Sequence, residues 1–182
     1  KPAKRDHIIS LLQKMIDEIE DDHKKRLQEL EAIENLSIIR PLTENEYTLM
    51  LMFNTVQELN VSQLSGILGF EIELGYANVI KLPKEISQND KEQRRIYECV
   101  RHYMKSSRNC LISPVVDGQL VIFIPVQPNR EADLQSLLLY QDALKTIEYI
   151  ENQTGYQTVI GIGSLKQGIE GLRQSYNEAF QA

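Results

Sequence analysis

The sequence has no excess of basic residues, little cysteine and no long apolar run. Its 182 residues include 26 Asp and Glu against 20 Lys and Arg, which gives a formal net charge of −6. This balance argues against a basic surface for nucleic-acid phosphates. No apolar run of about 18 residues occurs, so we expect no membrane span. Its two cysteines, Cys99 and Cys110, lack the spacing of a disulfide framework. A reducing, cytoplasmic setting is therefore expected.

The usual motifs of catalysis and ligand binding are also missing. Gly161 and Gly163 lack the third glycine of G-x-G-x-x-G, because Lys166 stands at that position. No G-x-x-x-x-G-K-[ST] sequence occurs. The histidines are far apart, and none has a metal-ligating partner four residues further on. We therefore expect no metal site, no cofactor and no enzymatic activity.

What is present is the composition of a globular domain, with 42% hydrophobic and 25% charged residues. That fraction is ordinary for a folded domain, and the chain is long enough to bury a sizeable core. The chain begins with Lys1-Pro2 and ends inside a predicted helix at Gln181-Ala182. We expect it to be the middle piece of a longer protein.

Residues 6–36 form a highly charged stretch in which apolar residues recur at near-heptad spacing. The apolar positions of this predicted seam are Leu12, Ile16, Ile19, Leu27 and Leu30. Acid–base pairs four residues apart, such as Glu20 with Lys24, support a helix. A narrow apolar stripe on a charged helix predicts a coiled coil that joins two copies into a homodimer. The alternative is a solvated helix that lies on the globular body.

The remainder of the chain alternates between predicted helices and strands. Pro41 is expected to end the first helix, and Thr43 with Glu46 resembles a capping box for the next. The expected elements are helices at 44–58 and 62–68, a strand within 70–82, a helix at 89–105, strands at 111–116 and 119–126, a helix at 131–152, a strand at 156–163 and a helix capped by Ser164. Asp117-Gly118 between two apolar runs predicts a hairpin with a type I′ turn. This order predicts an α+β fold in which helices cover the faces of a sheet.

This order, with a hairpin in its middle, resembles the nucleotidyl-cyclase-like fold of GGDEF domains. The segment 116–122 resembles the hairpin of this fold, and residues 159–164 followed by 172–179 are similar to degenerate GGDEF-like domains of bacterial transcription regulators. Two such families are the AraC-type response regulators and the sugar-diacid and purine-catabolism regulators. Lys1-Pro2 before a helix resembles the end of a receiver domain, which favours the first family. The implied domains are a receiver end with linker helix, 1–39, and a degenerate GGDEF-like domain, 40–182.

The resemblance implies a two-component phosphorelay protein that regulates transcription in the cytoplasm. This chain would be its non-catalytic segment for dimerisation and signal transmission, and the sensor kinase and DNA would bind only to parts absent here. Lys1 would be the receiver lysine that contacts a phosphorylated aspartate. An active cyclase of this fold needs acids on its first strand and in its hairpin turn, whereas this chain offers Asn78 and the lone Asp117. The alternative is a small-molecule-sensing domain of the sugar-diacid or purine-catabolism type.

Overall fold

The computed structural model describes residues 25–26, 38–55, 58–69, 73–126 and 132–182. The chain divides into two compact units, Lys1–Pro41 and Leu42–Ala182. The predicted dimer seam, from Leu12 to Leu30, and Lys1 lie outside the described residues, so the coiled coil stays a prediction. Within the described ranges, no helix has both the length and the apolar character needed to cross a membrane.

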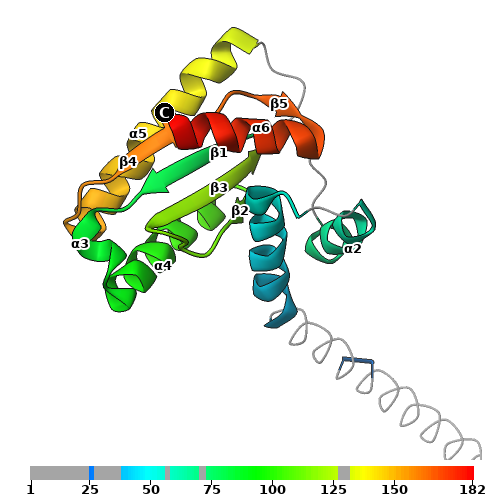
Figure 1. Ribbon diagram of the computed structural model, residues 1–182, viewed down its shortest axis with the longest axis horizontal. Helices are drawn as coiled ribbons and strands as arrows, with labels where there is room; N and C mark the ends of the chain where they lie inside the picture. Colours follow the sequence, from blue (N-terminus) through cyan, green and yellow to red (C-terminus); the bar gives the residue numbers. More distant parts are fainter. Residues whose placement is uncertain (1–24, 27–37, 56–57, 70–72, 127–131) are drawn as a thin grey trace, which may run out of the picture. The chain divides into compact units, whose positions relative to one another are not determined.

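The second unit is built on a five-stranded antiparallel sheet (Figure 1). Its strands are β1 (Leu74–Lys81), β2 (Leu111–Ile112), β3 (Gln119–Pro125), β4 (Val159–Ile162) and β5 (Lys166–Gln167). The order is β2-β3-β1-β4, and β5 pairs with β1. Strand β1 therefore lies at the centre of the sheet and pairs with β3 on one side and with β4 and β5 on the other.

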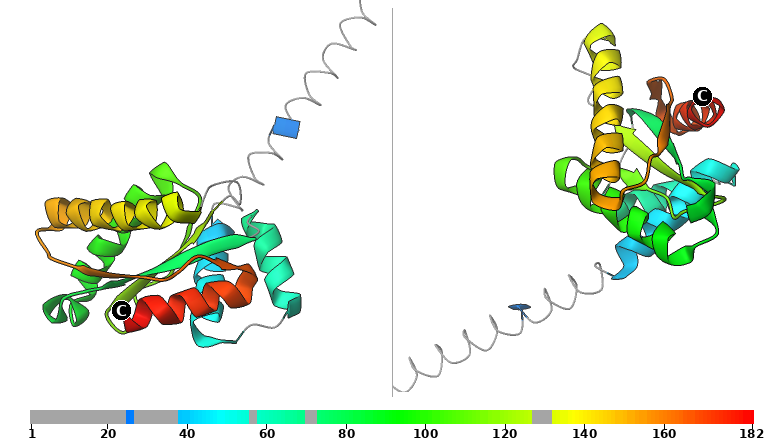
Figure 2. Two further views of the ribbon diagram at one scale, coloured as in Figure 1. Left: turned by 90° about the horizontal axis from the view of Figure 1, so that it is seen from above. Right: turned by 90° about the vertical axis from the view of Figure 1, so that its left-hand side faces the viewer.

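Helices cover both faces of this sheet, as the α+β prediction requires. They are α2 (Glu58–Leu68), α3 (Lys84–Ser87), α4 (Asp90–Ser107), α5 (Ala132–Thr154) and α6 (Gly168–Gln181). A further helix spans residues 38–53 and is called helix 38–53 below. Helices α4 and α5 pack on one face, and α6 lies on the other (Figure 2). The α+β fold class predicted from the sequence is confirmed.

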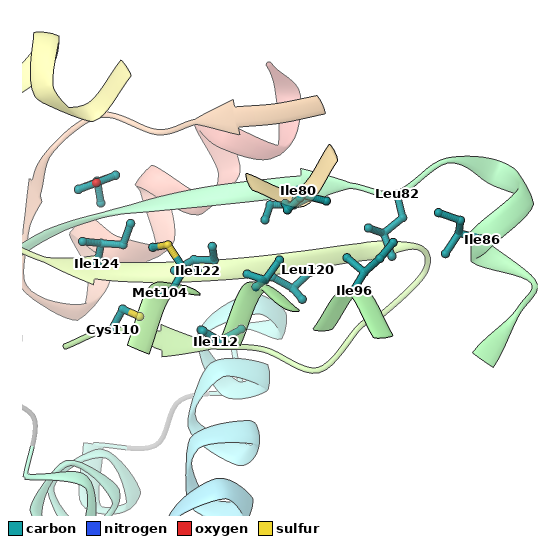
Figure 3. Close-up of a cluster of buried hydrophobic side chains, with 13 residues drawn as sticks. Ile80, Leu82, Ile86, Ile96, Met104, Cys110, Ile112, Leu120, Ile122 and Ile124 are labelled. Carbon is teal, nitrogen blue, oxygen red and sulfur yellow. The ribbon is translucent and has the colours of Figure 1, made fainter. Parts of the chain in front are cut away.

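Strand β3 has the predicted character of a central strand, because its side chains are buried on both faces. Leu120, Ile122 and Ile124 join the cluster formed with α4 and α5 (Figure 3). Val121 and Phe123 point to the opposite face, into a second cluster with α6 and helix 38–53. This strict alternation shows that two separate cores sandwich the sheet.

The Asp117-Gly118 hairpin is confirmed. Asp117 has φ 50° and Gly118 has φ 70°, so both residues adopt the left-handed conformation that a type I′ turn requires. Val116 and Gln119 exchange two backbone hydrogen bonds of 2.9 Å around the turn. Strand β2 is shorter than predicted because Pro114, which has no N–H to donate to a strand ladder, follows soon after it.

The prediction that Pro41 ends the first helix is wrong, and so is the capping role of Thr43. Residues 38–53 form one helix that runs through both positions. A proline removes one hydrogen bond and crowds one carbonyl of the preceding turn. The burial of Tyr47 and Leu51, each at most 2% exposed, offsets that cost. The helix ends before Asn54, whose φ of 58° is left-handed, and not at residue 58.

The start of the last helix also differs from the prediction. Helix α6 begins at Gly168, and Gln167 precedes it without a side-chain cap. The last two residues before α6, Lys166 and Gln167, instead form β5, which the sequence pattern did not indicate. Ser164 therefore does not cap the helix; its backbone N–H and its hydroxyl both donate hydrogen bonds to the carboxylate of Glu178 in α6.

Candidate functional site

The hairpin turn packs against the segment that follows β1. The carbonyl of Gly118 accepts a hydrogen bond of 2.9 Å from Leu82 N–H. Gly118 has φ 70°, and a Cβ atom there would lie 2.4 Å from the hydroxyl oxygen of Ser87, so a larger residue would be strained and would displace that side chain. Asp117 itself is exposed. Turn geometry and close packing explain both turn residues.

Asn78 occupies the middle of β1, where the resemblance directed attention to metal-binding acids. It is 2% exposed, and its Oδ1 atom is buried without a hydrogen-bond partner. Its neighbours two residues away on the same face, Tyr76 and Ile80, belong to the core with α4 and α5. Among the described residues, no group of three or more His, Cys, Asp or Glu could hold a metal ion.

The two cysteines differ in burial: Cys110 belongs to the core with α4 and α5, and Cys99 in α4 is half-buried. Both are free thiols, and Cys110 is fully buried. Burial raises the pKa of the Cys110 thiol to about 11, which keeps it protonated and unreactive at neutral pH. Burial also raises the pKa of Cys99.

A buried carboxylate joins helix 38–53 to the sheet and to α4. Glu44 is 3% exposed. Its Oε1 atom accepts a hydrogen bond of 2.8 Å from the backbone N–H of Ile112 in β2 and lies 2.8 Å from Lys105 Nζ. Its Oε2 atom lies 3.2 Å from the guanidinium of Arg101. Three elements therefore meet at one side chain, which we call the Glu44 junction (Glu44, Arg101, Lys105 and Ile112).

The surroundings of Arg101 and Lys105 differ from those that the sequence predicts. From the sequence alone we predict a solvated face for the basic residues of helix α4, which are Lys91, Arg94, Arg95, Arg101 and Lys105. In the structure the side chains of Arg101 and Lys105 are only 25% and 32% exposed and turn toward Glu44. Arg101 also donates a hydrogen bond of 3.0 Å to the hydroxyl of Tyr97. The signal for Glu44 was missed because it stands in a segment that resembles a capping box.

Helix α6 makes unusually close contact with the sheet backbone. A Cβ atom at Gly161 would lie 1.9 Å from the carbonyl oxygen of Ala179, and one at Gly163 would lie 2.0 Å from that of Ser175. The hydroxyl oxygen of Ser175 accepts a hydrogen bond of 2.9 Å from Ala77 N–H. Gly161 in β4, Gly163 directly after it and small residues in the helix thus let α6 lie directly against β1 and β4.

The apolar positions of α6 predict one buried face, and the structure buries them to different degrees; they are Ile169, Leu172, Tyr176, Ala179 and Phe180. Leu172 is fully buried, while Ile169 and Tyr176 pack partly buried against the same core. Phe180 is 45% exposed, and its ring centroid lies 6.0 Å from that of Tyr176. Ala179 is fully buried, and so is Ser175, which is not one of the predicted apolar positions; the close approach of the helix leaves no room for a large side chain at either place.

Helix 38–53 and α6 share one hydrophobic core on the same face of the sheet. From helix 38–53 it receives Tyr47, Met50 and Leu51, and from α6 it receives Leu172 and Ala179. The sheet contributes Val79, Val121 and Phe123 from β1 and β3. The helix that enters the domain and the helix that ends the chain are therefore coupled through common packing.

A pocket of about 270 Å³ opens beside the Glu44 junction. Its lining includes Asn45 from helix 38–53, Asp90, Arg94 and Tyr97 from α4, and Pro114 and Val115 from the loop after β2. The Oδ1 atom of Asn45 is buried and has no hydrogen-bond partner. The pocket thus lies between the incoming helix and the body of the domain.

Comparison with known proteins agrees with this architecture. The profile of the GGDEF-like domain matches residues 57–182, so the chain belongs to that family. The chain is also similar in structure to the regulator of polyketide synthase expression from Bifidobacterium adolescentis, with 14% sequence identity and a TM-score of 0.42. That match covers 76% of this chain and 49% of the regulator, so the chain spans about half of that protein's length. No curated protein sequence matches the chain.

Proposed function

We propose that this chain is the non-catalytic dimerisation and signal-transmission segment of a DNA-binding two-component response regulator of the AraC type. It would work in the cytoplasm as a homodimer through its N-terminal helix. A degenerate GGDEF-like domain would then carry a phosphorylation-dependent change from a receiver domain to a DNA-binding region. Sensor kinase and DNA would contact other parts of the parent protein.

The observation that carries this proposal is the shared core of helix 38–53 and α6. A shift of helix 38–53 changes the packing around Leu51, and the same core holds Leu172 of α6. Packed cores move between discrete arrangements rather than deforming continuously, so such a shift is passed on across the sheet face. The Glu44 junction adds a second, polar connection from the same helix to α4 and β2.

The hairpin supports a non-catalytic role. A hard divalent ion needs several oxygen ligands, most of them anionic. The turn supplies Asp117 alone, and β1 supplies the buried amide of Asn78. Incubation with GTP and magnesium should therefore yield no cyclic dinucleotide by chromatography. A product that disappears in the Asp117→Ala variant would contradict this part of the proposal.

Self-association provides the direct test. The double variant Ile16→Asp with Ile19→Asp places two charges in the predicted seam and should give a folded monomer by light scattering, whereas we expect a dimer for the parent chain. The control Gln13→Asp with Gln28→Asp adds the same charge beside the seam and should stay dimeric. An unchanged mass in the first variant would show that the seam is wrongly placed.

A second candidate function is a small-molecule-sensing domain of the sugar-diacid or purine-catabolism type. The pocket beside the Glu44 junction favours it, because a ligand there would contact both helix 38–53 and α4. Ligand binding to the purified chain separates this role from purely mechanical transmission.

A further inference from the structure

The pocket beside the Glu44 junction carries two opposite charges that do not pair with each other. Asp90 and Arg94 are four residues apart on α4, with the acid on the N-terminal side, which is the favourable arrangement for an ion pair. Both line the pocket. Within the part of the chain that the structure describes, neither forms an ion pair, although Arg95 on the same helix does so with Glu92. The pocket therefore presents a free carboxylate and a free guanidinium.

Asn45 in helix 38–53 supplies a third polar group to the lining. Its Oδ1 atom is buried, lacks a partner and belongs to a residue that lines the pocket. Buried polar atoms normally have a hydrogen-bond partner, and leaving one unpaired costs free energy. A donor group on a bound molecule would satisfy this acceptor.

The rest of the lining is mostly apolar, apart from the amide of Gln93, whose Nε2 atom donates a hydrogen bond of 2.7 Å to the carbonyl of Ser87. The ring of Tyr97 and the side chains of Pro114 and Val115 line the pocket. The hydroxyl of Tyr97 is already engaged by Arg101, which holds the ring in place. A volume of about 270 Å³ is close to the lower end of ligand pockets and admits only a small molecule.

We propose that this pocket binds a small zwitterion of the amino-acid class. Arg94 would hold its carboxylate, Asp90 and the Oδ1 atom of Asn45 would accept hydrogen bonds from its ammonium group, and its side chain would lie against Tyr97 and Val115. Guanidinium–carboxylate pairs are among the strongest hydrogen-bonded contacts in proteins. A bound molecule would bridge helix 38–53 and α4. This inference goes beyond signal transmission. Because binding is measured on the chain itself, its test does not depend on whether the predicted dimer seam is correct.

The test uses the complete chain and the common L-amino acids as probes, one at a time, by calorimetry and by thermal unfolding. At least one should bind and raise the unfolding temperature. Its N-acetyl derivative, which lacks the ammonium group, and its amide derivative, which lacks the carboxylate, should not bind. Arg94→Gln and Asp90→Asn should each weaken binding about tenfold or more. The control Lys91→Gln removes an exposed charge from the same helix outside the pocket and should bind like the parent.

Three outcomes would overturn the proposal. The first is that none of the amino acids binds. The second is binding that stays unchanged in both Arg94→Gln and Asp90→Asn, which would place the ligand elsewhere. The third is equal binding of the N-acetyl derivative, which would identify a simple anion site. Both substituted residues are exposed, so the unfolding temperature without ligand should match that of the parent and show that the variants fold.

Discussion

The hydroxyl oxygen of Ser175 in α6 accepts a hydrogen bond of 2.9 Å from the backbone N–H of Ala77 in β1. Ala77 precedes Asn78, which pairs with the last residue of β4, and the carbonyl of Ala77 accepts a 2.9 Å hydrogen bond from Gly163 N–H. A helix side chain thus completes the bonding of a central strand. Both residues are fully buried, so no water replaces this bond.

Ser175→Ala should therefore destabilise the domain. The substitution leaves the buried N–H of Ala77 without a partner, which costs about 1–3 kcal/mol. Urea unfolding at equilibrium measures the effect. Ser106→Ala is the matched control, because that exposed hydroxyl bonds only to a carbonyl of its own helix. Equal stability of the two variants would show that Ala77 finds another acceptor.

Gly161→Ala should be among the most damaging single-methyl changes in the chain. Its Cβ atom would lie 1.9 Å from the carbonyl oxygen of Ala179, a backbone atom that moves only if α6 moves. We expect a loss of about 3 kcal/mol, the upper part of the usual range for overpacking.

The control for this change is Gly66→Ala in α2, where a Cβ atom meets nothing within 4 Å. A helical glycine replaced by alanine should gain about 0.5–1 kcal/mol. Opposite signs for the two alanine substitutions in thermal unfolding would confirm the close contact of α6. A gain at both positions would contradict it.

Much of the fold could be predicted because local signals and tertiary packing agree. Helix α4 starts at Asp90, close to the predicted position, and the side chain of Asn89 caps it by accepting hydrogen bonds from the N–H groups of Lys91 and Glu92. The apolar run of β3 predicts burial on both faces, and its residues 120–124 are at most 4% exposed. The Asp117-Gly118 turn has a strong sequence signal because few residue pairs adopt left-handed conformations side by side.

The candidate site could not be predicted in the same way, because it depends on contacts between distant residues. Glu44 precedes Arg101 by 57 positions and Ile112 by 68. Nothing in the local sequence distinguishes its carboxylate from an ordinary acid in a helical first turn. The same holds for Pro41, where burial of the following residues outweighs a local helix-breaking signal. Short β5 was missed because two residues carry no periodicity.

The hydrogen bonds from Ser164, after β4, to Glu178 in α6 should make the domain less stable in acid. The hydroxyl of Ser164, followed by its backbone N–H, lowers the pKa of Glu178 to about 2. Because the folded pKa lies below the unfolded value of 4.5, the stabilisation is complete above that value and disappears as the pH falls through about 2. The stability difference between the parent and Glu178→Gln should therefore be constant near neutral pH and shrink in acid.

Unfolding midpoints of the parent and of Glu178→Gln, measured from neutral to acid pH, test the prediction. In Ser164→Ala the hydroxyl donor is lost, so the pKa of Glu178 rises and the acid-dependent loss should begin at higher pH. Lys166, whose Nζ lies 3.1 Å from Glu178, still favours the carboxylate in that variant. If the difference in stability between the parent and Glu178→Gln does not change with pH, the carboxylate of Glu178 does not accept these hydrogen bonds from Ser164 in solution.

The Glu44 junction leads to a graded prediction for two substitutions. Glu44→Ala leaves the buried N–H of Ile112 without an acceptor and leaves Arg101 and Lys105 without their counter-charge. Breaking a buried ion pair from one side costs about 3–5 kcal/mol. Arg101 and Lys105 are partly exposed and recover some hydration, so we expect the lower end, about 3 kcal/mol.

Glu44→Gln separates the hydrogen bond from the charge. The glutamine still offers an oxygen to Ile112 N–H but no longer neutralises the two cations, so its loss of stability should fall between those of Glu44→Ala and the control. That control is Glu46→Ala, an exposed acid on the same helix, which should change stability by no more than about 0.5 kcal/mol. Amide hydrogen exchange at Ile112 should be faster in Glu44→Ala than in Glu44→Gln, because only the first loses the acceptor. If both exchange alike and the two stabilities are equal, the charge alone holds helix 38–53 to the sheet, and the contact with β2 contributes nothing to its position.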